Sequence, residues 1–139
     1  MDLIAISLTV ITASTPLLLA ATGELITEKS GVLNLGVEGM MLVGAIAAFA
    51  TAYITGSSVI GIIAGAMAGT LLGTVFAVLT LIFLANQVAT GLALTIFGIG
   101  LSALIGTNFV GIALEPLPKL EIIGLSDISV IGELFFKQD

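Results

Sequence analysis

Apolar residues fill four long stretches of the chain, and short polar or turn-forming segments separate them. From residue 39 to residue 114 there is no charged residue at all. Because a helix that crosses a bilayer needs about 20 mainly apolar residues, this region alone suffices for about three crossings. The pattern predicts four spanning helices, at about residues 3–23, 32–54, 59–84 and 88–105.

Three short interruptions set the limits of these predicted helices. The polar stretch GELITEKSG at residues 23–31 is expected to connect the first two, TGSS at 55–58 the next two, and ANQ at 85–87 the last two. Pro16 lies inside the first run, where lipid-embedded helices tolerate a proline if neighbouring groups satisfy the freed carbonyl. Residues 1–106 therefore predict an all-α polytopic membrane helix bundle.

The last part of the chain, residues 107–139, differs in composition. It holds Pro116, Pro118, most of the acidic residues and two of the three lysines, yet many of its residues are apolar. This mixture predicts a loop or an amphipathic segment that lies on the membrane surface or partly re-enters the bilayer. The expected fold is a bundle of about four transmembrane helices followed by an amphipathic C-terminal segment.

Composition narrows the class of protein. Of 139 residues, 58% are hydrophobic and 9% are charged, whereas soluble domains have about 25% charged residues. The chain lacks the polar surface that a soluble protein needs, so the lipid bilayer is its expected environment. Cysteine and histidine are absent, which excludes disulfides, thiolate metal sites and histidine-based triads within the sequence. Three lysines give no basic patch for nucleic acid, and there is no phosphate-binding loop, so no cofactor, metal or catalytic residue is expected.

The third apolar run carries a glycine at every fourth position: Gly61, Gly65, Gly69 and Gly73. Residues four apart share one face of a helix. In lipid, a face without side chains lets another helix backbone approach closely and gain dispersion contacts. The strip therefore predicts tight helix packing, and a pore-lining face is the alternative.

Asn34 and Glu38 lie among glycines near the start of the second apolar run, and their spacing predicts that they share one helix face. An ionised carboxylate at the bilayer centre costs about 3 kcal/mol, so Glu38 needs an interface, a cavity, a partner or a proton. In one interpretation Ser30 or Asn34 caps the second helix, and Glu38 lies in its first turn. In the other, the glycines break the helix within the membrane, and both side chains line a polar cavity.

Asn86 and Gln87 raise the same question before the fourth apolar run. A polar pair between two apolar runs is typical of a turn at the membrane surface. The alternative is that both side chains make polar contacts along a transport path. The residues alone leave both interpretations open.

Three stretches of the sequence resemble one family of membrane proteins. TPLLLAATGELITEKSGVLNLGVEGMMLVGA at 15–45, NQVATGLALTIFGIGLSALIG at 86–106 and LSDISVIGELFFKQD at 125–139 resemble, in this order, bacterial ABC transporter permeases for nucleosides and simple sugars. Ribose-type and branched-chain amino-acid permeases are looser relatives. The resemblance implies a multi-pass subunit of the cell membrane that performs no chemistry itself. It also favours the broken-helix interpretation, with Asn34 and Glu38 lining the translocation path.

The resemblance implies partners as well. A second permease subunit would complete the path, cytosolic ATP-binding subunits would supply energy, and an extracytoplasmic lipoprotein would deliver the solute. Family members are about twice as long and carry a cytosolic coupling segment that is not found in this sequence. The chain therefore resembles the N-terminal half of a permease, as a truncated gene, a split gene or a fragment.

Two further points stay open. One lysine at one side of the predicted bundle against two at the other does not fix the orientation, and the resemblance favours an extracytoplasmic tail. The alternative function is a small membrane scaffold or assembly protein that binds helices through its glycine face and transports nothing.

Overall fold

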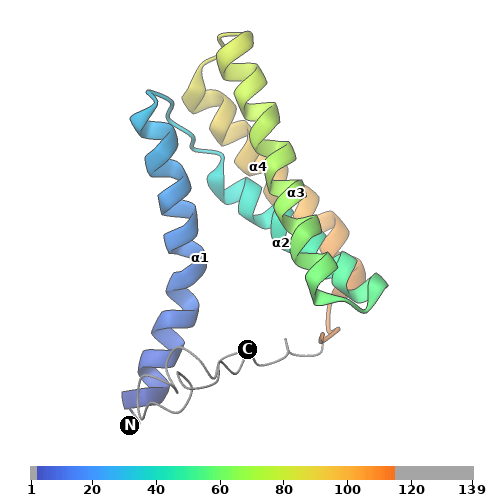
Figure 1. The fold of residues 1–139 in the computed structure, drawn as a ribbon. Coiled ribbons are helices and arrows are strands. Elements are labelled where there is room, and N and C mark those ends of the chain that lie inside the picture. The colour runs from blue at the N-terminus through green and yellow to red at the C-terminus, as the bar shows by residue number, and fades with distance from the viewer. Residues whose placement is uncertain (1–2, 115–139) are drawn as a thin grey trace. The chain divides into compact units, whose positions relative to one another are not determined.

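The computed structural model describes residues 3–114, and long helices dominate this part of the chain (Figure 1). The elements are α1 (Leu3–Lys29), α2 (Val37–Thr55), α3 (Ser58–Ala77), the π-helical turn η1 (Val78–Ile82), α4 (Gln87–Gly106) and the 3-10 turn η2 (Thr107–Phe109). Four helices among the described residues are long and apolar enough to cross a membrane. The predicted all-α polytopic helix bundle is confirmed, while the amphipathic segment expected after residue 114 lies outside the described residues.

The first connection differs from the prediction. Helix α1 does not end near residue 23 but continues through the polar stretch to Lys29. Gly31 then takes a left-handed conformation with φ of +82°, which commonly terminates a helix. Helix α2 begins at Val37, five residues later than predicted from the apolar run. The backbone N–H groups of Leu33 and Asn34 donate to side chains of α4 and α1, so they do not form a helical turn.

The described residues divide into two units, residues 3–19 and residues 20–114. In the first unit, the described residues belong to α1, which contains Pro16. Immediately before this proline, the hydroxyls of Ser14 and Thr15 donate to the carbonyl oxygen of Ile11, in the preceding turn, at 3.1 and 2.8 Å. Such hydroxyl bonds to the preceding turn satisfy these polar groups within the helix itself.

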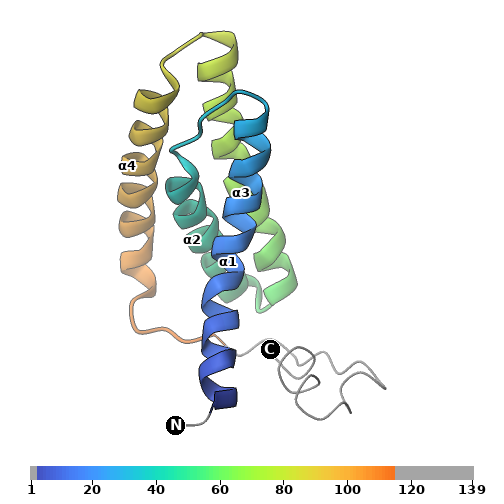
Figure 2. The same ribbon diagram turned by 90° about the vertical axis from the view of Figure 1, so that its left-hand side faces the viewer.

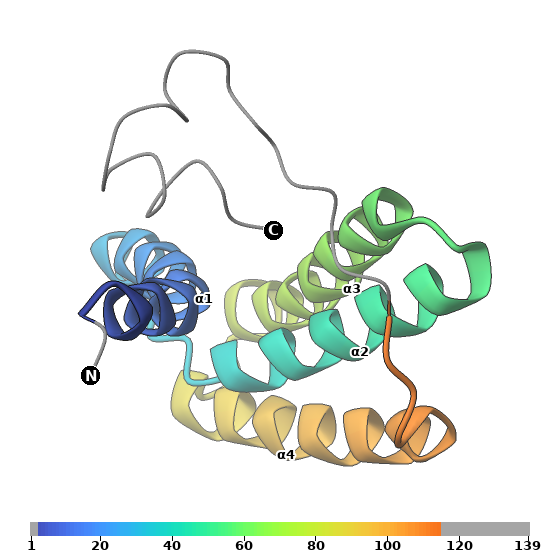
Figure 3. The same ribbon diagram turned by 90° about the horizontal axis from the view of Figure 1, so that it is seen from below.

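In the second unit, α2 lies between α3 and α4 and contacts both (Figure 3). Helix α3 runs antiparallel to α2 and α4 (Figure 2). The buried apolar side chains at the centre are Leu72, Phe76 and Leu94. At the far end of the bundle, the ring of Phe109 packs edge-on against Phe49 and Tyr53 of α2, with centroids 5.8 and 5.7 Å apart.

The glycine strip of α3 divides into two halves. A Cβ atom added to Gly61 would lie 2.7 Å from the carbonyl oxygen of Ala48, and one on Gly65 would lie 2.8 Å from that of Gly44. These two glycines therefore face the α2 backbone at distances that exclude any side chain. At Gly69 and Gly73 the nearest atoms belong to Met40 of α2, at 3.6 and 3.8 Å, which is ordinary contact. The close packing is thus confined to the N-terminal half of α3.

Helix α4 approaches α2 even more closely, at a second pair of glycines. A Cβ atom on Gly98 would lie 2.5 Å from the Cα atom of Gly39. A Cβ atom on Gly39 would clash with the carbonyl oxygen of Leu94 and lie 2.7 Å from the Cα atom of Thr95. Backbone-to-backbone contact of this kind is how helices associate in lipid, where burying large apolar side chains brings little gain.

The end of α3 departs from regular α-helix. Over Val78–Ile82 the helix widens to a π turn, in which the buried hydroxyl of Thr80 donates to the carbonyl oxygen of Phe76 at 2.8 Å. The turn closes through Leu84, which has a φ of +54° and is 82% exposed. Glycine is the usual residue at such a left-handed position because a Cβ atom crowds the backbone there.

We expect Leu84→Gly to stabilise the protein by about 1 kcal/mol, because it removes this backbone strain and few side-chain contacts. Leu81→Gly is the matched control, since Leu81 is also exposed but lies within the π turn. There glycine should destabilise by about 1 kcal/mol through lost backbone entropy. Thermal unfolding in detergent, followed by circular dichroism, measures both. Equal effects of the two substitutions would contradict the expectation.

Candidate functional site

The connecting segment, residues 30–36, is the main irregular stretch between the first two helices. Its backbone polar groups bond to side chains of α1 and α4. The amide of Val32 donates to the carbonyl oxygen of Thr27 in α1 at 3.0 Å, just after the chain leaves that helix. From there the segment passes along α4 until α2 begins.

Glu24 of α1 holds the middle of the connecting segment. Its Oε1 accepts a hydrogen bond from the backbone N–H of Asn34 at 2.9 Å, and its Oε2 accepts one from the hydroxyl of Thr27 at 3.1 Å. A carboxylate that accepts a backbone N–H forms a charge-assisted bond, which is stronger than one between neutral groups. The sequence predicts that Glu24 lies in a polar connection, but in the structure its carboxylate accepts hydrogen bonds from Asn34 and Thr27.

Helix α4 supplies two further partners. The Oε1 of Gln87 accepts from the backbone N–H of Leu33 at 2.8 Å, and the hydroxyl of Thr95 donates to the carbonyl oxygen of Leu35 at 2.9 Å. Gly91 lies between them, where a Cβ atom would be 2.9 Å from the backbone nitrogen of Leu35. The connecting segment thus lies directly against the backbone of α4 over its first two turns.

Asn34 is the buried polar residue of the connecting segment, with 8% of its surface exposed. Its Oδ1 accepts from the backbone N–H of Gly36 at 3.0 Å, and its Nδ2 donates to the sulphur of Met40 at 3.7 Å. The N-cap residue of α2 is Gly36, with no side-chain cap. The interpretation in which Ser30 or Asn34 caps this helix is therefore wrong, and the hydroxyl of Ser30 instead donates to a carbonyl of α1.

Glu38 lies in the first turn of α2 and is exposed, on the same side of the helix as the exposed residues Met41 and Ala45. The expectation that Asn34 and Glu38 share a helix face is wrong, because Asn34 precedes the helix. One side chain is buried against α2 and the other points away from it. The structure therefore does not bring these two predicted residues together.

Asn86 and Gln87 have different local roles. Asn86 caps α4, since its Oδ1 accepts from the backbone N–H of Ala89 at 3.0 Å, and its side chain is exposed. Gln87 is half-buried and is joined to the connecting segment through Leu33. Of the four predicted pathway residues, Asn34 and Gln87 therefore lie in one hydrogen-bonded network, and Asn86 and Glu38 lie outside it.

Comparison with known proteins assigns the chain to a family. Residues 6–124 match the family described as "Branched-chain amino acid transport system / permease component". The chain belongs to this permease family. It is therefore not an enzyme, and with its four apolar helices it is a multi-pass protein of the cell membrane.

Two curated relatives of the permease chain are ABC transporter subunits. The putative glucose ABC transporter permease protein TsgC13 of Haloferax volcanii is 42% identical over 129 residues, which cover 90% of this chain and 39% of the relative. The guanosine ABC transporter permease protein NupQ of Bacillus subtilis is 31% identical over 132 residues, which cover 87% of this chain and 41% of the relative. The chain thus spans about two fifths of the length of these relatives. No solved structure matches it significantly.

Reasoning from sequence missed several residues of the permease's connecting-segment network. Glu24 was assigned to a polar connection, yet its carboxylate turns inward, whereas Glu28 on the next turn is exposed. Thr95 and Gly91 lie in an apolar run and carried no separate signal. All three act on the backbone of the connecting segment, whose path depends on tertiary contacts.

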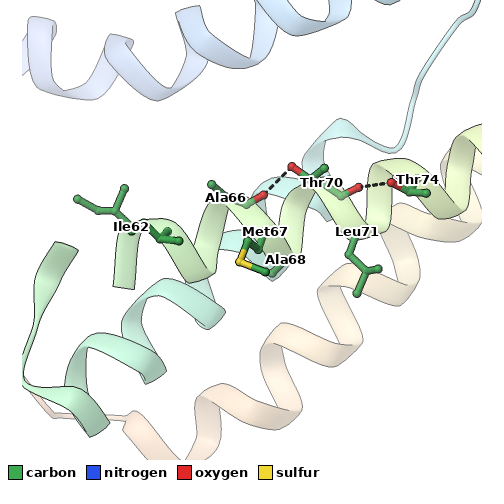
Figure 4. Close-up of a pocket in the computed structure, with 8 residues that line it drawn as sticks. Ile62, Ala66, Met67, Ala68, Thr70, Leu71 and Thr74 are labelled. Atoms are coloured by element: carbon green, nitrogen blue, oxygen red, sulfur yellow. Dashed lines mark hydrogen bonds between the residues drawn. The ribbon is translucent and has the colours of Figure 1, made fainter. Parts of the chain in front are cut away.

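The outer face of α3 forms an apolar hollow in the permease chain (Figure 4). Its described lining residues all belong to α3 and include the exposed side chains of Ile62, Met67 and Leu71. The hydroxyls of Thr70 and Thr74 donate to carbonyl oxygens of their own helix, at 2.7 and 2.9 Å, so they offer no free donor. This face suits lipid tails or another apolar helix, and not a polar solute.

Proposed function

We propose that the chain forms part of the translocation path of an ABC importer for nucleosides or simple sugars. The names of the two relatives, a glucose permease and a guanosine permease, support this class of solute. The observation that carries the proposal is the connecting segment, whose non-helical backbone is paired with side chains of α1 and α4.

The depth of the connecting segment supports a place on the path. It lies beside residues 87–95 of α4, the first 12 Å or so of that helix at 1.5 Å per residue. Non-helical backbone at membrane depth is tolerated only where it is buried in protein or lines a water-filled cavity. In transporters, non-helical backbone within the membrane forms solute sites because it presents polar backbone and side-chain groups.

Residues near the break supply suitable chemistry. The exposed carboxylate of Glu38 accepts hydrogen bonds, and sugar hydroxyls and nucleobase N–H groups are donors that it suits. Asn34, four residues before Glu38 but outside the helix, carries amide donors, and Asn86 is exposed at the start of α4. We assign Gln87 a positioning role, because its amide oxygen is already engaged by the backbone of Leu33.

Transport needs partners that the chain itself does not provide. The sequence has no phosphate-binding loop, so the energy would come from cytosolic ATP-binding subunits. A second permease subunit would complete the path, and an extracytoplasmic solute-binding lipoprotein would deliver the solute. These partners follow from membership in the family and from the names of the relatives as ABC transporter subunits.

The test is ATP-dependent uptake into cells or vesicles that contain the full transporter, with radiolabelled glucose and guanosine as probes. We expect uptake of one of them, and a rise in KM of tenfold or more in Glu38→Gln, since a bond to a charged group contributes about 1.5–3 kcal/mol. Glu28→Gln is the matched control, because Glu28 is also exposed but lies on α1, and it should leave KM unchanged.

Two results would contradict the proposal. Normal uptake by Glu38→Gln would remove this carboxylate from the path. No uptake of either probe, together with stable purification of the chain without partner subunits, would favour the scaffold that packs helices and transports nothing.

A further inference from the structure

The first turn of α2, which carries Glu38, lacks the side-chain cap that commonly fixes the start of a helix. Its N-cap residue is Gly36, which has no side chain to accept from the next backbone N–H groups. A helix end without such a cap has one restraint fewer on its first turn. Contacts from outside α2 therefore contribute to the direction in which Glu38 points.

Thr95 of α4 contacts the chain on both sides of Glu38. Its hydroxyl donates to the carbonyl oxygen of Leu35, three residues before Glu38, at 2.9 Å. Its Cα atom lies against Gly39, the residue after Glu38, where an added Cβ atom would be only 2.7 Å away. Thr95 therefore restrains the backbone both before and after Glu38.

The hydrogen bond of Thr95 differs from that of other threonines in these helices. A hydroxyl in a helix commonly donates to the carbonyl four residues earlier, which satisfies it locally. The described threonines that make this local bond are Thr15, Thr55, Thr70, Thr74 and Thr80. Thr95 instead reaches Leu35, 60 residues earlier in the chain. The carbonyl of Gly91 is the corresponding local acceptor, so the hydroxyl of Thr95 could be satisfied without Leu35, and the consequence of its bond lies in the segment that it holds.

We propose that Thr95 is a positioning residue for solute recognition, because it holds the first turn of α2 where Glu38 can accept a hydrogen bond from the solute. This inference rests on the proposed function, in which the exposed carboxylate of Glu38 is an acceptor for sugar hydroxyls or nucleobase N–H groups. Because a hydrogen bond requires a donor–acceptor distance of about 2.5–3.2 Å, a small shift of this turn on α4 weakens solute binding while Glu38 itself is unchanged.

The test is the uptake kinetics of the assembled transporter with Thr95→Val, which keeps the shape of the side chain and removes its hydroxyl. We expect KM for the transported probe, glucose or guanosine, to rise about fivefold, the scale of one lost hydrogen bond between neutral groups. The maximal rate should change less than about twofold, because the loss is one of binding. Thr70→Val is the matched control: it removes a hydroxyl that bonds within α3, and it should leave KM unchanged.

A double-mutant cycle shows whether Thr95 acts through Glu38. In a Glu38→Ala background no acceptor is left to position, so adding Thr95→Val should raise KM by less than about twofold. Independent changes add in free energy, so a merely structural effect of Thr95→Val would multiply KM in this background as it does alone. Such a multiplied effect would overturn the positioning role.

A second variant tests the hydrogen bond itself. Thr95→Ser retains the hydroxyl that donates to Leu35, so KM should stay within about twofold of that of the unaltered transporter. A KM as high as that of Thr95→Val would show that the bond is not responsible. A fall in the maximal rate of Thr95→Val at unchanged KM would show a role in folding alone, because KM does not depend on the amount of folded protein.

The outcomes separate this inference from the proposed function. If Glu38→Gln raises KM and Thr95→Val does not, the positioning role is overturned and the proposed function stands. If Glu38→Gln leaves uptake normal, the proposed function loses its acceptor on the path, and the positioning role fails with it.

Discussion

Replacing Gly98 with alanine is expected to destabilise the helix bundle by about 3 kcal/mol, at the upper end of the usual cost of overpacking. The added methyl group would lie 2.5 Å from the Cα atom of Gly39, and that atom belongs to the backbone of another helix. A backbone cannot move aside as a flexible side chain can, so α2 and α4 would have to separate. Unfolding in detergent, followed by circular dichroism, measures the change in free energy.

Gly100 provides the matched control on the same helix. A Cβ atom added there meets nothing within 4 Å, so Gly100→Ala brings no clash. Alanine also favours a helix over glycine by up to about 1 kcal/mol, so this substitution should be neutral or stabilising. The two substitutions are chemically identical, and opposite signs would locate the effect in the α2–α4 contact. Similar effects of both would show that this contact does not hold the bundle together.

The sequence predicts the number and type of the helices well because the bilayer imposes a length of apolar residues on each. It predicts where helices approach one another less well. The strip from Gly61 to Gly73 has a uniform spacing, yet only its first half meets the α2 backbone closely. Two straight helices that cross are closest at one point along their axes, and the spacing of residues within one helix does not indicate where that point lies.

The closest helix contact joins Gly39 to Gly98, which belong to different predicted helices and form no pattern within either. A periodic strip can be found by inspection of one segment, but a pair of single glycines can be recognised only when both helices are placed. The regular spacing therefore indicated tight packing of the third apolar run, but it gave no comparison with the Gly39–Gly98 contact, which is the tightest among the described residues.

The candidate site shows a similar limit. Asn34 and Glu38 were expected on one helix face, which holds only if the helix includes both residues. Glu24, ten residues before Asn34, accepts from the backbone N–H of Asn34, and Gln87, 54 residues after Leu33, accepts from that of Leu33. Local spacing cannot reveal such partners, because their contribution exists only after the helices have assembled.

Removing the acceptor of the connecting segment is the second change with a large expected effect. Glu24→Leu leaves the backbone N–H of Asn34 without a partner, which costs about 1–3 kcal/mol for a buried donor. The same change removes a charge from a spanning helix, which favours insertion by a comparable amount. The raw stability of this variant therefore mixes two opposing terms, and a reference variant is needed to separate them.

Glu28→Leu is that reference, because Glu28 is exposed one turn later on α1 and its loss removes a charge but no bond to the connecting segment. We expect Glu24→Leu to be less stable than Glu28→Leu by about 1–3 kcal/mol in detergent unfolding. Glu24→Gln, which retains an acceptor oxygen, should recover most of the difference. Under the proposed function, uptake by the assembled transporter should follow the same order, since this bond would hold the connecting segment on the path. If Glu24→Leu and Glu28→Leu unfold alike, the bond to Glu24 does not contribute to holding the connecting segment in place.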